Sequence, residues 1–318
     1  MGLEVSTLAI LPLMSQYSHP RAVEATTKYF LIQALATALA LFSASLNAWM
    51  LGTWEINQML HPVIASIMIL ALGLKTGLAP MHFWFPEVLQ GLNLNIALIL
   101  STWQKLAPMI LIYQLSTMMD QKMITFIGMT SALVGGWGGL NQTQMRKILA
   151  YSSIAHMGWM MIILTYSPKL MMLNLMIYVI MTSTMFMALK AMSVTKINTL
   201  GTSWTKAPII TLIILVTMLS LGGLPPMTGF MPKWLILQEL TKQELPVVAT
   251  VMAMSALLSL FFYMRICYST TLTIFPNTNN TKTPWQLKPT LAPTLLAGTT
   301  ATTIFLLPTS PTFVAMMM

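Results

Sequence analysis

The chain has 318 residues, of which 56% are hydrophobic and only 7% are charged, and its formal net charge is +9. No hydrophilic stretch is long enough to build a soluble domain with a core of its own, so the composition excludes a soluble globular protein. The single cysteine, Cys267, excludes a disulfide framework and a cysteine-ligated iron–sulfur cluster.

The other residue types that carry cofactors are also too scattered to form a binding site. The four histidines include no pair spaced four residues apart, and no glycine-rich phosphate loop follows a strand. The basic residues are spread over short loops, which suits the anionic surface of a membrane better than a nucleic acid. We therefore expect this chain to bind no cofactor, no metal and no nucleic acid, and to contact membrane lipids, with cardiolipin as a candidate.

Apolar runs of about 20 residues recur along the chain, the length that crosses a hydrocarbon core of about 30 Å as a helix. Because period-two alternation is absent, we predict an all-α polytopic transmembrane bundle of about ten spans, in one domain over residues 1–318. The apolar segments are 1–14, 25–46, 60–80, 95–116, 123–140, 148–166, 170–190, 208–222, 226–240, 246–270 and 291–308. The first segment is too short to span a membrane, so we expect the chain to begin partway through a helix.

Two places interrupt the regular succession of spans. Segments 208–222 and 226–240 are joined by Gly and Pro residues at 222–226, a density of helix breakers that predicts a bend or a discontinuous helix. A polar loop at 277–290, rich in Asn, Thr, Lys and Pro, separates a final transmembrane helix, 291–308, from the other spans.

Three lysines interrupt the apolar runs: Lys75, Lys105 and Lys233. A cation in the middle of a span costs about 2.5–3.5 kcal/mol on insertion scales, so such residues are functional candidates by default. Lys105 lies about 15 Å from either end of its segment, too deep for easy snorkelling. Pro108 cannot donate to the carbonyl of Gln104, which predicts a broken helix with a free acceptor beside the ammonium. The alternative is a structural lysine bound to that carbonyl.

Lys233 repeats the arrangement in a later part of the chain. Pro232 precedes it, the segment 222–229 is rich in Gly and Pro, and a continuous helix would leave the carbonyl of Thr228 free. Two proline-interrupted helices with a lysine at each break suggest two related half-units and an ion or proton path.

Lys75 is paired in our interpretation with Glu4, a rare acid within an apolar segment. A carboxylate there needs a partner, and pairing favours the protonated lysine, whereas its loss favours the neutral amine. Such a pair is a switch that loads and releases a proton. Pro80 can end the helix soon after Lys75, however, so snorkelling is an alternative for this lysine.

Histidines can relay protons near neutral pH, which makes His82 and His156 further candidates. Hydroxyl groups of Tyr151, Ser152 and Ser153 lie about one helical turn from His156. We name His82, Tyr151 and Ser153 as candidate relay residues. A structural role in helix packing is the alternative for each histidine.

Four segments give the chain a family resemblance. Residues 135–159, GGWGGLNQTQMRKILAYSSIAHMGW, are the most specific of them. They are supported by 80–87 (PMHFWFPE), 102–108 (TWQKLAP) and 220–234. With these segments the chain closely resembles the antiporter-like membrane subunits of respiratory complex I, which are related to cation/proton antiporters. The resemblance covers essentially the whole chain.

The resemblance implies two inverted helical repeats, each with a broken helix, around a hydrated polar axis. Glu4 and Lys75 match the glutamate–lysine pair of the family, and Lys105 matches the broken-helix lysine of the first half. His156 matches a residue on the connecting axis, and Lys233 matches the terminal lysine of the second half.

In function, the resemblance implies a core membrane subunit of the proton-pumping NADH:ubiquinone oxidoreductase. NADH, FMN, iron–sulfur clusters and ubiquinone would then act in other subunits, and other membrane subunits of complex I would be the partners. The 31 methionines are typical of animal mitochondrial genes and point to the mitochondrial inner membrane. Three alternatives stay open: a non-pumping scaffold in the same complex, a free-standing cation/proton antiporter, and a quinone-binding redox subunit.

Overall fold

The computed structural model describes residues 2–16, 19–55, 61–116, 118, 120–205, 207–272 and 293–317. All regular secondary structure in these residues is helical, apart from one isolated bridge between Gln144 and Lys196. The helices are α1 (Gly2–Ser15), α2 (Pro20–Leu51), α3 (Pro62–Thr76), α4 (Trp84–Gly91), α5 (Leu94–Ser101), α6 (Trp103–Leu115), α7 (Gln121–Gly138), α8 (Met145–Leu164), α9 (Pro168–Met192), α10 (Ile197–Gly201), the 3-10 turn η1 (Thr202–Thr205), α11 (Pro208–Gly222), α12 (Phe230–Lys242), α13 (Pro246–Thr271) and α14 (Pro293–Met317). The predicted all-α membrane fold is confirmed.

Five helical segments are long and apolar enough to cross a membrane: α2, the α5–α6 segment Leu94–Leu115, α8, α9 and α13. Shorter apolar helices are α1, α3, α11 and the Thr294–Thr309 part of α14. The described helices follow the predicted apolar segments closely, and the total of about ten spans stays a prediction. The predicted loop at 277–290 lies outside the described residues.

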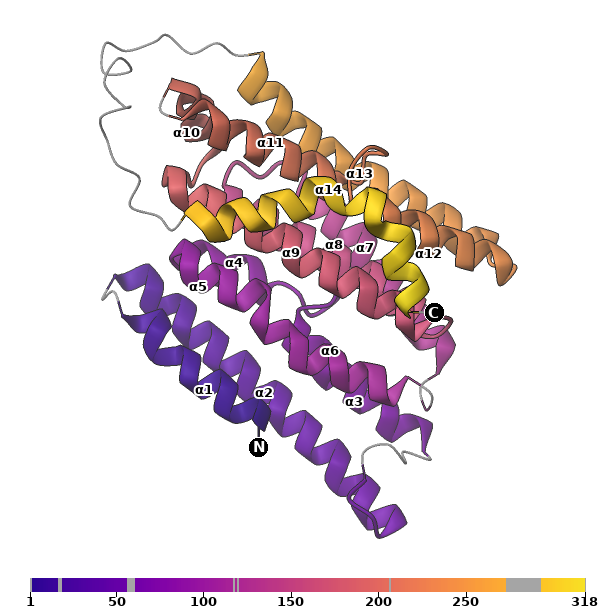
Figure 1. The fold of residues 1–318 in the computed structure, drawn as a ribbon. Helices are drawn as coiled ribbons and strands as arrows, with labels where there is room; N and C mark the ends of the chain where they lie inside the picture. Colours follow the sequence, from indigo (N-terminus) through magenta and orange to yellow (C-terminus); the bar gives the residue numbers. More distant parts are fainter. Residues whose placement is uncertain are drawn as a thin grey trace.

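Helix α8 is the central element of the bundle (Figure 1). Nearly all of its residues are buried, including the polar side chains of Ser152, Ser153 and His156. Glycines bring α7 into close contact with it, because a Cβ atom built at Gly135 would lie 2.5 Å from the backbone nitrogen of Ala155. Peripheral α2 instead exposes large apolar side chains such as Leu31 and Phe42, the kind of surface that lipid or another membrane protein covers.

The first predicted helix break exists, but not where the proline suggested. Helix α5 ends at Ser101 and α6 begins at Trp103, and Thr102 between them has a distorted right-handed conformation with φ −113° and ψ −72°. Pro108 lies inside α6, which continues through it, because the loss of one backbone hydrogen bond does not end this helix. The break therefore precedes Lys105.

The second break is longer. Helix α11 ends at Gly222, Gly223 adopts the left-handed conformation with φ +82°, and α12 begins at Phe230. Pro232 consequently lies in the first turn of α12, where a missing N–H needs no partner. Pro232 would leave the Thr228 carbonyl without a donor only if the helix were continuous there, and it is not.

Two parts of the fold differ from the sequence-based expectation. The predicted segment 60–80 ends early, because Gly77 at φ +78° terminates α3, and the short helix α4 that follows was not predicted. The final helix, predicted at 291–308, is described from Pro293 and continues to Met317. Figure 1 shows this helix, α14, in yellow, lying against α9, and it also contacts α11.

Candidate functional site

The three predicted lysines are all buried within the helix bundle. Their exposed fractions are 7% for Lys75, 4% for Lys105 and 8% for Lys233. None of them has a carboxylate within 4.0 Å in the part of the chain that the structure describes. Lys105 and Lys233 therefore depend on dipoles, and Lys105 also on aromatic rings, for their stabilisation.

At the second break, the ammonium of Lys233 is held by the end of the preceding helix. Its Nζ donates to the carbonyl of Gly222 at 2.9 Å and to that of Leu221 at 3.3 Å. These are among the last carbonyls of α11, which have no partner within the helix and carry the negative end of its dipole. A Cβ atom at Gly223 would lie 2.9 Å from the Lys233 Cδ, so glycine also leaves room for the lysine stem.

At the first break, a tyrosine hydroxyl stands between the lysine and the helix end. The Lys105 Nζ donates to the hydroxyl of Tyr178 at 3.2 Å, and that hydroxyl donates to the Ser101 carbonyl, the last of α5, at 3.1 Å. The ammonium also lies 4.7 Å from the centroid of the Phe85 ring, which α4 supplies. The structural alternative for Lys105, a bond to the carbonyl of Gln104, is not seen, because its ammonium donates to Tyr178 instead.

His156 connects the two breaks. Its ring lies 5.6 Å from the Tyr178 ring, centroid to centroid, and it lies near the carbonyl of Leu221, which accepts from Lys233. The charges of Lys105 and Lys233 both act on this imidazole. Sequence-predicted residues from α6, α8 and α12 thus meet in one continuous series of contacts.

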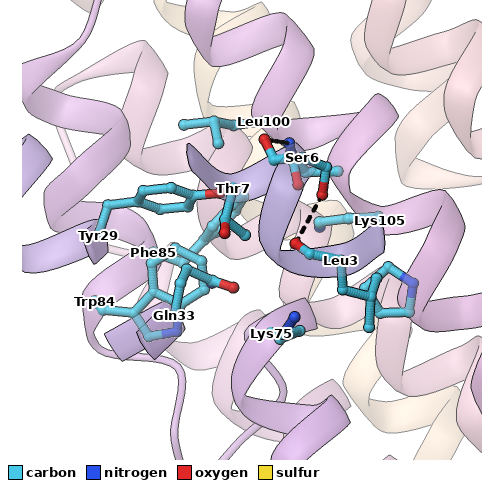
Figure 2. A pocket seen from close by; sticks show the side chains of 12 residues that line it. Leu3, Ser6, Thr7, Tyr29, Gln33, Lys75, Trp84, Phe85, Leu100 and Lys105 are labelled. Carbon is cyan, nitrogen blue, oxygen red and sulfur yellow. Dashed lines mark hydrogen bonds between the residues drawn. The ribbon is translucent and has the colours of Figure 1, made fainter. Parts of the chain in front are cut away.

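Lys75 and Glu4 lie near each other without forming an ion pair. The Lys75 Nζ makes no hydrogen bond to the residues that the structure describes, although the charge of Glu4 acts on it. Lys75 and Lys105 line one cavity of about 10 Å³, roughly the room that one water molecule needs (Figure 2). Glu4 lines a neighbouring cavity of about 190 Å³, and Gln33 and Tyr29 line both.

The three candidate relay residues fall into two places. Ser153 lies near Tyr178, and its hydroxyl donates to the carbonyl of Ala150 at 2.7 Å. His82 and Tyr151 contact each other, with ring centroids 6.4 Å apart, and neither hydrogen-bonds to the three lysines. A ring nitrogen of His82 lies 3.3 Å from the carbonyl of Pro80 instead.

Tyr178 is a candidate site residue that sequence reasoning missed. It lies in α9 within the predicted segment 170–190, where the apolar pattern predicts that an aromatic residue packs in the core. One signal was present, because a buried tyrosine hydroxyl normally needs a hydrogen-bond partner. The partners, however, belong to α5 and α6, which only the folded chain brings to it.

Comparisons with known proteins assign the chain to a family. A family model described as NADH:quinone oxidoreductase/Mrp antiporter, TM, matches residues 1–259, and one described as NADH dehydrogenase subunit 2 C-terminus matches residues 260–314. The chain belongs to the NADH dehydrogenase subunit 2 family. A relative from Carassius auratus named NADH-ubiquinone oxidoreductase chain 2 is 61% identical over 311 residues, 98% of this chain and 89% of the relative.

Solved structures agree with this family assignment. A chain of respiratory complex I from Thermus thermophilus with bound aureothin has a TM-score of 0.82 and 27% sequence identity, covering 94% of this chain and 69% of that one. A chain of the membrane-bound sulfane sulfur reductase, an archaeal respiratory membrane complex, has a TM-score of 0.86 at 16% identity, covering 99% of this chain and 68% of that one. At that identity the second likeness shows the fold alone. The predicted family resemblance is confirmed, and the fold of this subunit 2 family member is that of the antiporter-like membrane proteins.

Proposed function

We propose that this subunit 2 family member is a core membrane subunit of the proton-pumping NADH:ubiquinone oxidoreductase of the mitochondrial inner membrane. Its role is to carry protons along a buried axis through Lys75, Lys105, His156 and Lys233, with Glu4 acting on the first lysine. Redox chemistry with NADH, FMN, iron–sulfur clusters and ubiquinone takes place in other subunits. Other membrane subunits of the complex and membrane lipids cover its exposed apolar faces.

The observation that carries the proposal is the connection between the two helix breaks. Each break places a lysine at the end of a helix, and Tyr178 and His156 lie between the two lysines. Every group in this series can exchange a proton or reorient a hydrogen bond. Lysines placed only to stabilise the bundle would have no need of such a connection.

The mechanism follows from the electrostatics of these groups. An ammonium that is buried without a counterion depends on a few dipoles, so a charge change nearby alters its proton occupancy. A change in the Glu4–Lys75 distance would alter the proton occupancy of Lys75, and the shared cavity passes that change to Lys105. Groups more than about 3.5 Å apart need a bridging water for the proton to cross.

Cation exchange is a less well supported function for this chain. An exchanger of metal cations needs several acids along its path, because carboxylates are the ligands that such ions prefer. Glu4 is the one acid whose charge acts on a lysine of the axis in the part of the chain that the structure describes. The serious competitor is a non-pumping scaffold subunit of the same complex.

The test is the number of protons pumped per NADH oxidised by the reconstituted complex carrying Lys105→Met. We expect the assembled variant to pump at least about tenfold more slowly, because methionine fills the space but cannot carry a proton. Lys242→Met is the matched control, since this exposed lysine pairs only with Glu239. Unchanged turnover and an unchanged proton ratio in Lys105→Met would support the scaffold instead.

A further inference from the structure

The Tyr178 side chain contacts both Lys105 and the end of α5. Its hydroxyl accepts from the Lys105 Nζ at 3.2 Å and donates to the Ser101 carbonyl at 3.1 Å. The side chain is 1% exposed, so bulk water does not compete for these bonds.

A phenolic hydroxyl differs from a backbone carbonyl in what it can do for a lysine. A carbonyl only accepts, so it stabilises the ammonium strongly, accepts a weaker hydrogen bond from the neutral amine, and cannot donate to the lone pair of that amine. A hydroxyl both accepts and donates, so it can serve either protonation state. With the ammonium, it accepts from Nζ while its own proton points to Ser101. With the amine, it can turn and donate to the nitrogen lone pair.

We propose that Tyr178 is a positioning residue that couples the protonation state of Lys105 to the geometry of the α5–α6 break. When Lys105 releases its proton along the axis, the Tyr178 hydroxyl changes acceptor from the Ser101 carbonyl to the Lys105 amine. Tyr178 keeps its own proton throughout, so only a hydrogen bond is exchanged. The Ser101 carbonyl then loses its donor, and the end of α5 is free to shift.

The packing of the ring gives the exchange a second consequence. The Tyr178 ring lies 5.2 Å from the Lys105 Nζ and 5.6 Å from the His156 ring. The same side chain therefore contacts the lysine of the first half and the histidine that leads to the second. A change in the hydrogen bond of the Tyr178 hydroxyl therefore takes place beside both Lys105 and His156.

This inference rests on the proposed function and is tested by a double-mutant cycle in the assembled complex. Tyr178→Phe removes only the hydroxyl and keeps the ring against His156 and Lys105. We expect it to lower coupled proton pumping by about tenfold, the effect of losing a hydrogen bond to a charged group. We also expect the double variant Tyr178→Phe with Lys105→Met to pump as slowly as Lys105→Met alone, because the hydroxyl acts through that lysine.

The control is Tyr113→Phe, a tyrosine on the same helix as Lys105 whose hydroxyl bonds to neither Lys105 nor Tyr178. It should pump as the unchanged complex does. If Lys105→Met loses pumping while Tyr178→Phe behaves as the unchanged complex, the inference fails and the proposed function stands. Losses that multiply in the double variant would also overturn it, because they would mean that Tyr178 acts independently of Lys105. If Lys105→Met itself pumps normally, the proposed function fails first.

Discussion

Both helix breaks bind a buried lysine ammonium near a helix end, but they do so through different hydrogen-bonding groups. At the α11–α12 break, Lys233 donates directly to two carbonyls of a helix end, 2.9 and 3.3 Å away. At the α5–α6 break, Lys105 reaches the helix end only through the hydroxyl of Tyr178. Fixed carbonyls can only accept, so they favour the ammonium, whereas a rotatable hydroxyl can also donate to the lone pair of the neutral amine. We infer from this comparison that the α11–α12 break favours the protonated form of Lys233 more strongly than the α5–α6 break favours that of Lys105.

The two breaks also differ in the length of the backbone segment that separates their helices. The first break consists of one residue, Thr102, between α5 and α6, and the lysine follows within one turn. The second break extends from Gly223 to Gly229, and its lysine stem packs against Gly223. A longer connection lets the ammonium approach the carbonyls directly, without an intervening side chain.

Among the substitutions that test this comparison, we expect Gly223→Ala to have the largest effect on activity and stability. The left-handed conformation at φ +82° costs about 1–2 kcal/mol for alanine, and the new Cβ atom would lie 2.9 Å from the Lys233 Cδ. We expect the lysine to be pushed off the α11 carbonyls, with coupled NADH oxidation falling severalfold and thermal stability falling as well. Both are measured on the purified complex.

Gly52→Ala is the matched control for that substitution. Gly52 has nearly the same backbone angle, φ +71°, but a Cβ atom there meets nothing within 4 Å. It should show the loss of stability from backbone strain without the loss of activity. Equal activity in the two variants would mean that direct contact with the helix end does not matter for Lys233.

A smaller effect is expected where α14 meets the second break. The hydroxyl of Thr228 lies 3.2 Å from that of Ser220 and donates to the carbonyl of Thr303 at 2.9 Å, joining α11 to α14. Thr228→Val removes this link at nearly constant volume and should lower stability by about 1 kcal/mol, with most of the activity retained. A melting curve of the complex measures it.

Thr299→Val on the exposed side of α14 is the control for that prediction, since its hydroxyl bonds only to carbonyls of its own helix. It should leave the melting temperature of the complex nearly unchanged. A loss of stability as large as that of Thr228→Val would show that threonine content, and not the link between helices, determines the result.

The lysines and the existence of both breaks could be predicted from the sequence because each is a local signal: charge within an apolar run, and helix breakers close together. The position of the first break could not, because it depends on how α5 and α6 pack, and Pro108 is accommodated inside α6. The role of Tyr178 could not be predicted either, since its partners lie more than 70 residues away in the chain.

The Glu4–Lys75 pair shows a different limit of sequence reasoning. Two opposite charges in apolar segments predict proximity, and the charge of Glu4 does act on Lys75. Whether they touch depends on the side chains between them. Here Gln33 and Tyr29 line both of the cavities in which the two charges lie, and the direct ion pair is not formed.

The central claim is that the two breaks form one path through His156, and the most direct measurement is the proton-to-electron ratio of the complex carrying His156→Gln. Glutamine keeps a polar side chain with a hydrogen-bond donor at this position, but it does not titrate near neutral pH. The account predicts assembled complex with a clearly lowered ratio, or with pumping and NADH oxidation falling together. An unchanged ratio at unchanged turnover would contradict it, because the two lysines would then work without the histidine between them.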